Sequence, residues 1–452
     1  MEKPGAGTGG AAPALGQQEP RGRAVWYFIL LVVAIQLILG PKIQLSQWGV
    51  AAGTETLTPA AKPKRTPSSW DKPHGQNAAV AEGMAWLKGQ TNLDIPHADG
   101  PEPEKRLHDT AWYKGKAYNV FPPLMAFLTV LLSPLQVYLL PLTDGIWLQT
   151  TYVLLVFWPL PVVGYLVFRK QTGDSAWAAL LTLAWMGGTA VLPNLEGARW
   201  GFLGQINHVL SQVGLLILAA DVLGRQRLWP GIIGLAIATY SRQLAFLYGL
   251  PLLWIAWRQS PRRAAWCLAG LAAVAGPLLT LNYLKFGNPL DFGYQYIYAG
   301  READDYMTQR CRDFGVFSPH FIPENLYYLN ICPPIVDLDG LNVRFFERDQ
   351  NGISMWITTP LAAYVFITAG WWWRDPRRRA LMLGTLPVIF GMLCYHSPGF
   401  MEHGYSRFAL DFLPIWLVVV ASQTRGGWRT HFTLGCIAWS LLYFHQLMPA
   451  AQ

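Results

Sequence analysis

Long apolar runs without charged side chains constrain this chain most. Residues 146–168, IWLQTTYVLLVFWPLPVVGYLVF, contain no charged residue. Only 14% of the 452 residues are charged, against about 25% in an average soluble protein. These features exclude a disordered chain, a small disulfide-stapled protein and an ordinary soluble enzyme. Since a helix needs about 20 apolar residues to cross a bilayer, they predict an all-α polytopic membrane protein with about 11 transmembrane helices and outer loops that carry interfacial helices.

The polar segments suggest how such a chain is organised. Residues 1–24 are rich in Gly, Ala and Pro and predict a disordered cytoplasmic tail. The membrane domain is then expected over 25–447, including two large extracytoplasmic loops at 42–145 and 284–354. Residues 121–141 are apolar but contain four prolines; because proline interrupts helical hydrogen bonding, this segment predicts a helix lying at the membrane interface.

The positive charges sort to one side of the predicted topology. Lys and Arg outnumber Asp and Glu by 35 to 27, and many lie in short loops such as 374–379, RDPRRR. Short cytoplasmic loops are enriched in Lys and Arg, so we expect a multi-pass integral membrane protein with its N-terminus in the cytoplasm. The excess of positive charge therefore indicates a lipid bilayer as partner, and not a nucleic acid.

The sequence lacks the familiar motifs of soluble enzymes and metal sites. The chain contains no P-loop, no HExxH and no CxxC motif, and it has five cysteines. Cys311 and Cys332 could pair if their loop is extracytoplasmic, and two thiols are an equal alternative. No set of residues has the spacing of a metal site, so we expect neither a metal nor a cofactor.

Polar residues gather where the predicted helices meet the outer surface. An enzyme that acts on a lipid head group would collect such residues at one surface, whereas a transporter would spread them through the membrane. Arg407 and Asp411 could form a local ion pair, or Arg407 could bind an anionic phosphate with two hydrogen bonds. The residues in this group are Asn207, His208, Arg242, Asn282, Tyr405, Arg407 and Asp411.

The first outer loop contains two candidate catalytic acids, Asp71 and Asp109. Tyr113, Lys116 and Tyr118 follow Asp109, which would place a base near a phosphate-binding cation. A carboxylate between aromatic rings at an interface is partly desolvated, and the resulting rise in pKa makes it a better base. The alternative is that both acids are solvated loop residues.

The second outer loop is rich in tyrosines, among them Tyr294. Tyrosine rings are amphipathic and suit a bound sugar or a belt at the membrane interface equally well.

Taken together, several blocks resemble the GT-C membrane glycosyltransferases that use a lipid-phosphate sugar donor. The closest similarity is to bacterial members of the dolichyl-phosphate-mannose-type branch. Family members commonly carry a paired acid at the first motif, whereas Lys72 follows Asp71 here, so Asp109 competes with Asp71 as the base. The blocks are DKPHGQNAAVAEGMAWLKGQTNLD at 71–94, DTAWYKGKAYNVFPPL at 109–124, TYSRQLAFLYGLPLLW at 239–254, FGNPLDFGYQY at 286–296 and HGYSRFALDFLP at 403–414.

The resemblance implies an inverting glycosyltransferase in a bacterial inner membrane, with its active site on the extracytoplasmic side. It would move a hexose or pentose from a polyprenyl-phosphate carrier to a glycan, lipid or protein acceptor. Asp71 or Asp109 would act as general base, His74 would belong to the substrate site, and Lys116, Arg242 or Arg407 would stabilise the departing phosphate. The alternative from another functional class is a non-enzymatic flippase or assembly factor for lipid-linked sugars with a decayed GT-C fold.

Overall fold

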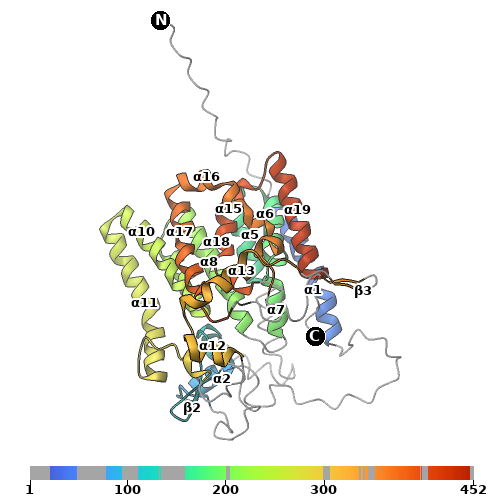
Figure 1. The fold of residues 1–452 in the computed structure, drawn as a ribbon. Coiled ribbons are helices and arrows are strands. Elements are labelled where there is room, and N and C mark those ends of the chain that lie inside the picture. Colours follow the sequence, from blue (N-terminus) through green and yellow to red (C-terminus); the bar gives the residue numbers. More distant parts are fainter. Residues whose placement is uncertain are drawn as a thin grey trace.

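Helices dominate the part of the chain that the structure describes (Figure 1). The computed structural model describes residues 21–47, 78–93, 110–131, 133, 158–199, 204–298, 306–334, 337–339, 342–344, 352–397, 399 and 406–447. In the first half the elements are α1 (Arg21–Gln47), α2 (Ala78–Leu87), β1 (Thr110–Tyr113), β2 (Lys116–Asn119), α5 (Pro159–Thr172), α6 (Ser175–Gly187), α7 (Val191–Arg199), α8 (Gly204–Leu223), α9 (Trp229–Ser241), η2 (Gln243–Tyr248), α10 (Gly249–Gln259) and α11 (Pro261–Phe286).

The second half is divided into shorter elements. They are η3 (Tyr294–Tyr296), α12 (Tyr306–Phe314), η4 (Pro319–Phe321), α13 (Ile322–Asn330), β3 (Asp337–Asp339), β4 (Asn342–Arg344), α14 (Met355–Thr358), η5 (Pro360–Ala363), α15 (Tyr364–Ile367), α16 (Ala369–Arg374), α17 (Pro376–Leu393), η6 (Arg407–Asp411), α18 (Leu413–Val420), η7 (Ala421–Gln423), α19 (Trp428–Leu442) and the π-helical turn η8 (Tyr443–Leu447).

The prediction of about 11 transmembrane helices is wrong. Among the described residues only two helices are long and apolar enough to cross a membrane, Ile206–Leu223 and Pro261–Phe286. The first of these segments is 83% buried inside the protein and the second 28%. Two helices could therefore span a membrane, and most residues of the α11 segment are not buried inside the protein.

The physical reason for this error is that an apolar run need not form one continuous helix. Residues 355–374 lie in the short elements α14, η5, α15 and α16. Pro360 begins η5, and the Thr368 hydroxyl donates to the Tyr364 carbonyl at 2.6 Å, which competes with helical backbone bonding. Met355, Leu361 and Tyr364 of these pieces are buried in the core, whereas Phe366 and Trp373 are exposed. Burial inside the protein therefore accounts for part of a composition that also suits a membrane span.

The helices pack around one large apolar core that includes Trp185, Tyr248 and Tyr364. Helices α8 and α9 approach so closely that a Cβ atom added at Gly214 would lie 2.4 Å from the Gly234 carbonyl oxygen. Only glycine permits this distance between the two backbones. The pair α8–α9 is thereby fixed at the centre of the bundle.

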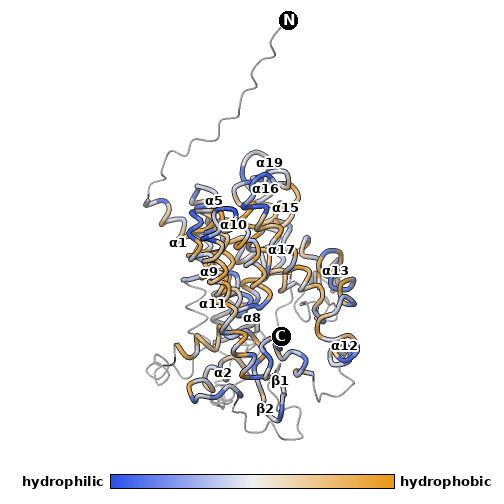
Figure 2. The backbone as a smooth tube through the Cα atoms, turned by 90° about the vertical axis from the view of Figure 1, so that its left-hand side faces the viewer, coloured by the Kyte–Doolittle hydropathy of each residue, from blue (hydrophilic) through white to orange (hydrophobic). Residues whose placement is uncertain are grey.

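The two ends of the helical bundle differ (Figures 1 and 2). One end carries α2, the antiparallel β1–β2 hairpin and α12, and we refer to it as the hairpin end. The opposite end carries the interhelical segments 169–174, 224–228, 258–263, 374–379 and 423–430, which contain most of the arginines of the bundle; we refer to it as the basic end.

Contacts between these segments establish the basic end. Arg425 forms an ion pair with Asp174, and Lys170 Nζ donates to the Ala220 carbonyl at 3.2 Å. Arg263 Nη2 donates to the Gln226 carbonyl at 2.8 Å. The N-terminal helix is tied into the same bundle, because the Tyr165 hydroxyl donates to the Ala24 carbonyl at 2.8 Å.

Two other predictions about organisation fall partly on described residues. Helix α1 begins at Arg21, inside the segment 1–24 that the sequence assigns to a tail. Residues 124–131 are helical, within the predicted interfacial helix 121–141. The remainder of that helix up to 141 lies outside the described residues, apart from residue 133.

Candidate functional site

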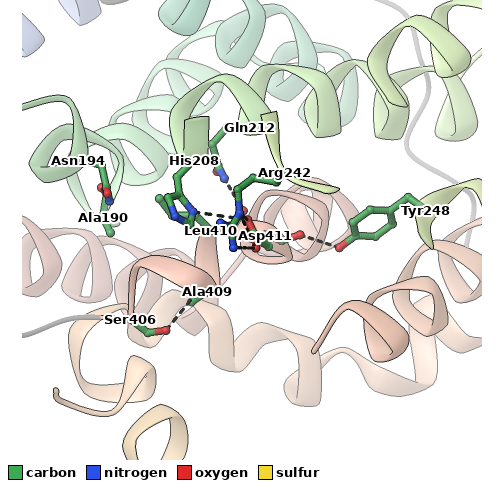
Figure 3. Close-up of polar contacts among 10 residues, drawn as sticks. All are labelled: Ala190, Asn194, His208, Gln212, Arg242, Tyr248, Ser406, Ala409, Leu410 and Asp411. Carbon is green, nitrogen blue, oxygen red and sulfur yellow. Dashed lines mark hydrogen bonds and ion pairs between the residues drawn. The ribbon is translucent and has the colours of Figure 1, made fainter. Parts of the chain in front are cut away.

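The polar centre of the bundle is built on the break between α9 and η2. Helix α9 ends at Ser241, and Arg242 is extended with φ −147° and ψ 108°. Its guanidinium binds both oxygens of the Asp411 carboxylate: Nη2 donates to Oδ2 at 2.9 Å, and Nε lies 3.2 Å from each oxygen. Figure 3 shows this pair facing inward between the helices. A two-bond pair of this kind fixes the plane and the position of both groups.

His208 completes the cluster from helix α8. Its Nδ1 lies 3.6 Å from Asp411 Oδ1 (Figure 3), and its ring stacks on Phe408 with centroids 5.6 Å apart. The Arg242 guanidinium carbon lies 5.0 Å from the centre of the same Phe408 ring. Asp411 is fully buried, whereas the Arg242 side chain keeps 20% of its surface exposed. We call His208, Arg242, Phe408 and Asp411 the Arg242 cluster.

The backbone beneath Asp411 is held in place by two side chains. The Tyr248 hydroxyl donates to the Asp411 carbonyl at 2.9 Å, and the Gln212 amide donates to the Leu410 carbonyl (Figure 3). Gln212 is itself held by Trp185, whose Nε1 donates to its side-chain oxygen at 3.1 Å. These bonds hold in place the backbone that carries the Asp411 carboxylate.

The hairpin end has an aromatic surface built by β1 and β2. Lys114 and Gly115 form the turn with φ of 49° and 72°, the backbone required by a two-residue hairpin loop. The Tyr113 ring lies 4.7 Å from the Tyr296 ring, measured between centroids. Tyr118 is buried against Phe286, and burial raises its pKa.

A buried ionic network joins this hairpin to helix α11, and the sequence did not predict it. Lys285 Nζ forms an ion pair with Glu82 of α2 and donates to the Asn119 carbonyl at 2.9 Å. The Asn119 amide donates to Glu82 Oε2 at 2.6 Å. Two features of the sequence could have indicated this pair: a single acidic residue within the apolar stretch of α2, and a single lysine near the end of the long apolar helix α11.

A cavity of about 740 Å³ lies beside the hairpin end, between residues 288–298 and 308–317. Tyr294 lines it, and the Tyr294 hydroxyl donates to the Gln243 side chain at 3.0 Å. The Tyr294 ring also packs against Tyr395, and the Tyr395 ring packs against Phe408. The cavity therefore lies next to the Arg242 cluster. Asp291 also lines the cavity, and the sequence pattern did not predict this carboxylate as a site residue.

The loop around the cavity is fixed by hydrogen bonds. Asp291 Oδ2 accepts from the Tyr296 hydroxyl at 2.8 Å, and partial burial together with this bond raises the pKa of Tyr296. On the opposite side, the Tyr298 hydroxyl lies 3.1 Å from His396 Nε2. His396 is buried, and desolvation together with the nearby Arg310 lowers its pKa to about 4.

The structure brings some predicted site residues together and separates others. His208, Arg242 and Tyr294 lie in or next to the Arg242 cluster, with Asn207 buried beside His208 on α8. Arg407 contacts the same Phe408 ring as Arg242, with its guanidinium carbon 5.4 Å from the ring centre.

Asp411, however, forms its ion pair across 169 residues with Arg242, rather than the local pair with Arg407 that its spacing suggested. Asn282 supports the backbone after α11, since its amide donates to the Pro289 carbonyl at 3.1 Å. Tyr113 and Tyr118 form the aromatic surface of the hairpin, and Lys116 is exposed beside them. Asp71, His74, Asp109 and Tyr405 lie outside the described residues.

Cys311 and Cys332 are both present as thiols. Within the described segments no group of three or more His, Cys, Asp or Glu residues is arranged to hold a metal ion.

Comparison of the chain with protein-family models, curated proteins and solved structures finds no match in any of the three.

Proposed function

We propose that the chain is an integral membrane glycosyltransferase that uses a polyprenyl-phosphate sugar as donor. It transfers a hexose or pentose to a glycan, lipid or protein acceptor, with inversion at the sugar carbon. The proposed location is a bacterial inner membrane, with the N-terminus in the cytoplasm and the reaction at the extracytoplasmic surface.

The charge difference between the two ends supports this orientation. Arginines concentrate at the basic end, and positive residues favour the cytoplasmic side of a membrane. The hairpin end and its cavity then lie on the extracytoplasmic side. A lipid-linked donor would present its phosphate and sugar at this level while its polyprenyl chain stays in the bilayer.

The observation that carries the proposal is the geometry of Arg242. Asp411 engages Nε and Nη2 of its guanidinium, and these bonds leave Nη1 with its two N–H groups for another acceptor. The side chain is 20% exposed, and the next residue, Gln243, accepts a hydrogen bond from Tyr294 of the cavity lining. A guanidinium held in a fixed plane is suited to bind a phosphate oxygen and to stabilise the charge that develops on it.

The reaction needs a base for the acceptor hydroxyl. In the proposed mechanism Asp71 or Asp109 takes the hydroxyl proton as the acceptor oxygen bonds to the anomeric carbon. The bond from that carbon to the phosphate oxygen breaks, and the polyprenyl phosphate leaves as an anion beside Arg242. One displacement inverts the configuration. In the sequence, Asp71 lies seven residues before α2 and Asp109 directly before β1.

A transfer assay with purified protein tests the proposal. The protein is incubated with a panel of radiolabelled polyprenyl-phosphate sugars and a cell-envelope acceptor fraction, and transferred sugar is measured. We expect Arg242→Lys to lower kcat/KM for the donor about 10- to 100-fold, since a point charge cannot reproduce a charge-assisted guanidinium bond. Arg262→Lys, at the basic end, is the matched control and should leave kcat/KM unchanged.

Absence of transfer from every donor in the panel would reject the enzyme. The alternative is a non-enzymatic flippase or assembly factor for lipid-linked sugars. Such a protein would tolerate loss of both Asp71 and Asp109 in a cellular complementation assay, whereas the proposed enzyme would not.

A further inference from the structure

The cavity beside the Arg242 cluster combines ring faces with fixed hydrogen-bonding groups. Its volume of about 740 Å³ lies in the range of about 300–1,000 Å³ found for small-molecule sites. Tyr294, Tyr298 and Phe317 supply aromatic surface, and Asn288 and Asp291 supply polar groups. Such a lining suits a ligand that has both apolar C–H faces and many hydroxyl groups.

Asp291 is held in one orientation by its own loop. Its Oδ1 accepts from the Gly293 backbone N–H at 2.9 Å, and its Oδ2 accepts from Tyr296 and from the Gln295 amide at 2.8 and 3.1 Å. A carboxylate has about four lone-pair sites, so three donors leave room for one more. A ligand hydroxyl could donate to this remaining position.

The two tyrosines that line the cavity are also fixed before any ligand binds. The Tyr294 hydroxyl donates to Gln243, and the Tyr298 hydroxyl is bonded to His396. Rings that are already oriented lose little conformational freedom on binding, which favours affinity. The lining is therefore preorganised on both sides of Asp291.

We propose that this cavity binds a pyranose ring, with Asp291 accepting a hydrogen bond from a ring hydroxyl and Tyr294 contacting a C–H face. The assignment rests on the proposed function for its biological context, because the ring could belong to the lipid-linked donor or to a glycan acceptor. Both sources share the same recognition chemistry, and the experiment below distinguishes them.

Cys311 provides a native reporter of occupancy. It lines the cavity and is partly exposed, whereas Cys267, Cys332, Cys394 and Cys436 are buried. N-ethylmaleimide should therefore modify Cys311 fastest in the folded protein. A sugar that fills the cavity should slow this modification, and mass spectrometry of the tryptic peptides measures its rate.

The test compares three ligands on purified wild-type protein: a panel of free mono- and disaccharides, polyprenyl-phosphate sugars, and sugar-free polyprenyl phosphate. Saturable protection of Cys311 by free saccharides assigns the cavity to the acceptor, and protection by lipid-linked sugars alone assigns it to the donor sugar. Protection by neither, or equal protection by sugar-free polyprenyl phosphate, overturns the proposal.

Two variants connect the protection to the proposed contacts. Asp291→Asn should weaken the protection of Cys311 by sugar about tenfold or more, since a charged acceptor is replaced by a neutral one. Asp313→Asn is the matched control, because Asp313 is an exposed acid in α12. Tyr294→Phe should keep protection and Tyr294→Ala should lose it. The labelling rate without sugar reports whether each variant keeps the cavity. If sugar protects Cys311 in Asp291→Asn as well as it does in the wild type, and the labelling rate without sugar is unchanged, the carboxylate has no role in binding.

The outcome is independent of catalysis. Saturable protection in a protein that transfers no sugar would retain the pyranose site and reject the glycosyltransferase. Transfer activity without any protection of Cys311 would retain the glycosyltransferase and reject the pyranose site.

Discussion

Lys285, one residue before the end of helix α11, forms a buried ion pair with Glu82 of α2. The Glu82 side chain is fully buried and that of Lys285 is 6% exposed. The Asn119 side chain and carbonyl join the same network and connect it to strand β2. The pair therefore fixes the hairpin end onto α11, an apolar helix of 26 residues.

Removal of one partner from this pair should be strongly destabilising. Lys285→Met leaves the Glu82 charge buried without compensation, a defect that costs about 3–5 kcal/mol. We expect a large fall in the thermal midpoint of the detergent-solubilised protein. The double variant Glu82→Gln/Lys285→Met removes both charges and should recover part of this loss. Lys116→Met, at an exposed lysine of the hairpin, is the control; if it lowers the midpoint as much as Lys285→Met, the ion pair has no special role.

The contact between α8 and α9 gives a second stability prediction. A methyl group at Gly214 would meet the Gly234 carbonyl and the Ala238 backbone nitrogen at 2.4 and 2.5 Å. Gly214→Ala should therefore destabilise the protein by about 1–3 kcal/mol through overpacking. Gly276 of α11 has no atom within 4 Å of its Cβ position, so Gly276→Ala should be neutral or stabilising by up to about 1 kcal/mol. Chemical denaturation of both variants measures the difference, and equal effects would contradict the close approach.

One local break in the chain was predictable from the sequence. Ser241 and Arg242 separate two short apolar runs, and the structure has its break there, with α9 ending at Ser241. An arginine is expensive in an apolar environment, which is why the sequence indicates this position. The partner of Arg242 was not predictable in the same way, because Asp411 lies 169 residues away.

The spacing of Arg407 and Asp411 suggested a local pair because periodicity describes only neighbours within one helix. Those residues lie in the 3₁₀ element η6, where the geometry differs from an α-helix. The Glu82–Lys285 pair also depends on packing between distant segments. The number of transmembrane helices was overestimated for a related reason, since apolar composition does not distinguish a buried broken helix from a span.

His396 predicts how stability depends on pH. Burial and Arg310 lower its pKa to about 4 in the folded protein, against about 6.5 in an unfolded chain. Between these values the unfolded state binds more protons, so stability should fall as the pH drops from 6.5 towards 4. The full effect corresponds to about 3 kcal/mol. Thermal midpoints measured from pH 7.5 to 4.5 should fall less in His396→Gln than in wild type, while the exposed His320→Gln should follow the wild-type curve. Identical curves for all three proteins would remove His396 as the cause.

The choice between Asp71 and Asp109 is the mechanistic prediction. In the proposed enzyme, Asp71 corresponds to the acid of the first motif in the glycosyltransferases that the sequence resembles, whereas a cation near Asp109 would lower the pKa of Asp109 and weaken it as a base. A general base contributes about 10²–10⁴ in rate. Asp71→Asn should thus abolish measurable transfer while donor binding and expression persist, and Asp109→Asn should act mainly on KM or stability. A dead Asp109→Asn together with an active Asp71→Asn would reverse the assignment.

Helix α11 allows the proposed orientation to be tested on a single element. Its 26 residues extend over about 39 Å at 1.5 Å per residue, which is enough to cross a hydrocarbon core of about 30 Å. Arg262 near its start and Asn288 just after its end are both exposed. In a Cys311→Ser background, Asn288→Cys should react with an impermeant maleimide in intact cells, and Arg262→Cys should react only after the membrane is opened. Labelling of both from outside would show that α11 does not span the membrane. Labelling of Arg262→Cys alone would reverse the orientation and place the Arg242 cluster and its cavity towards the cytoplasm.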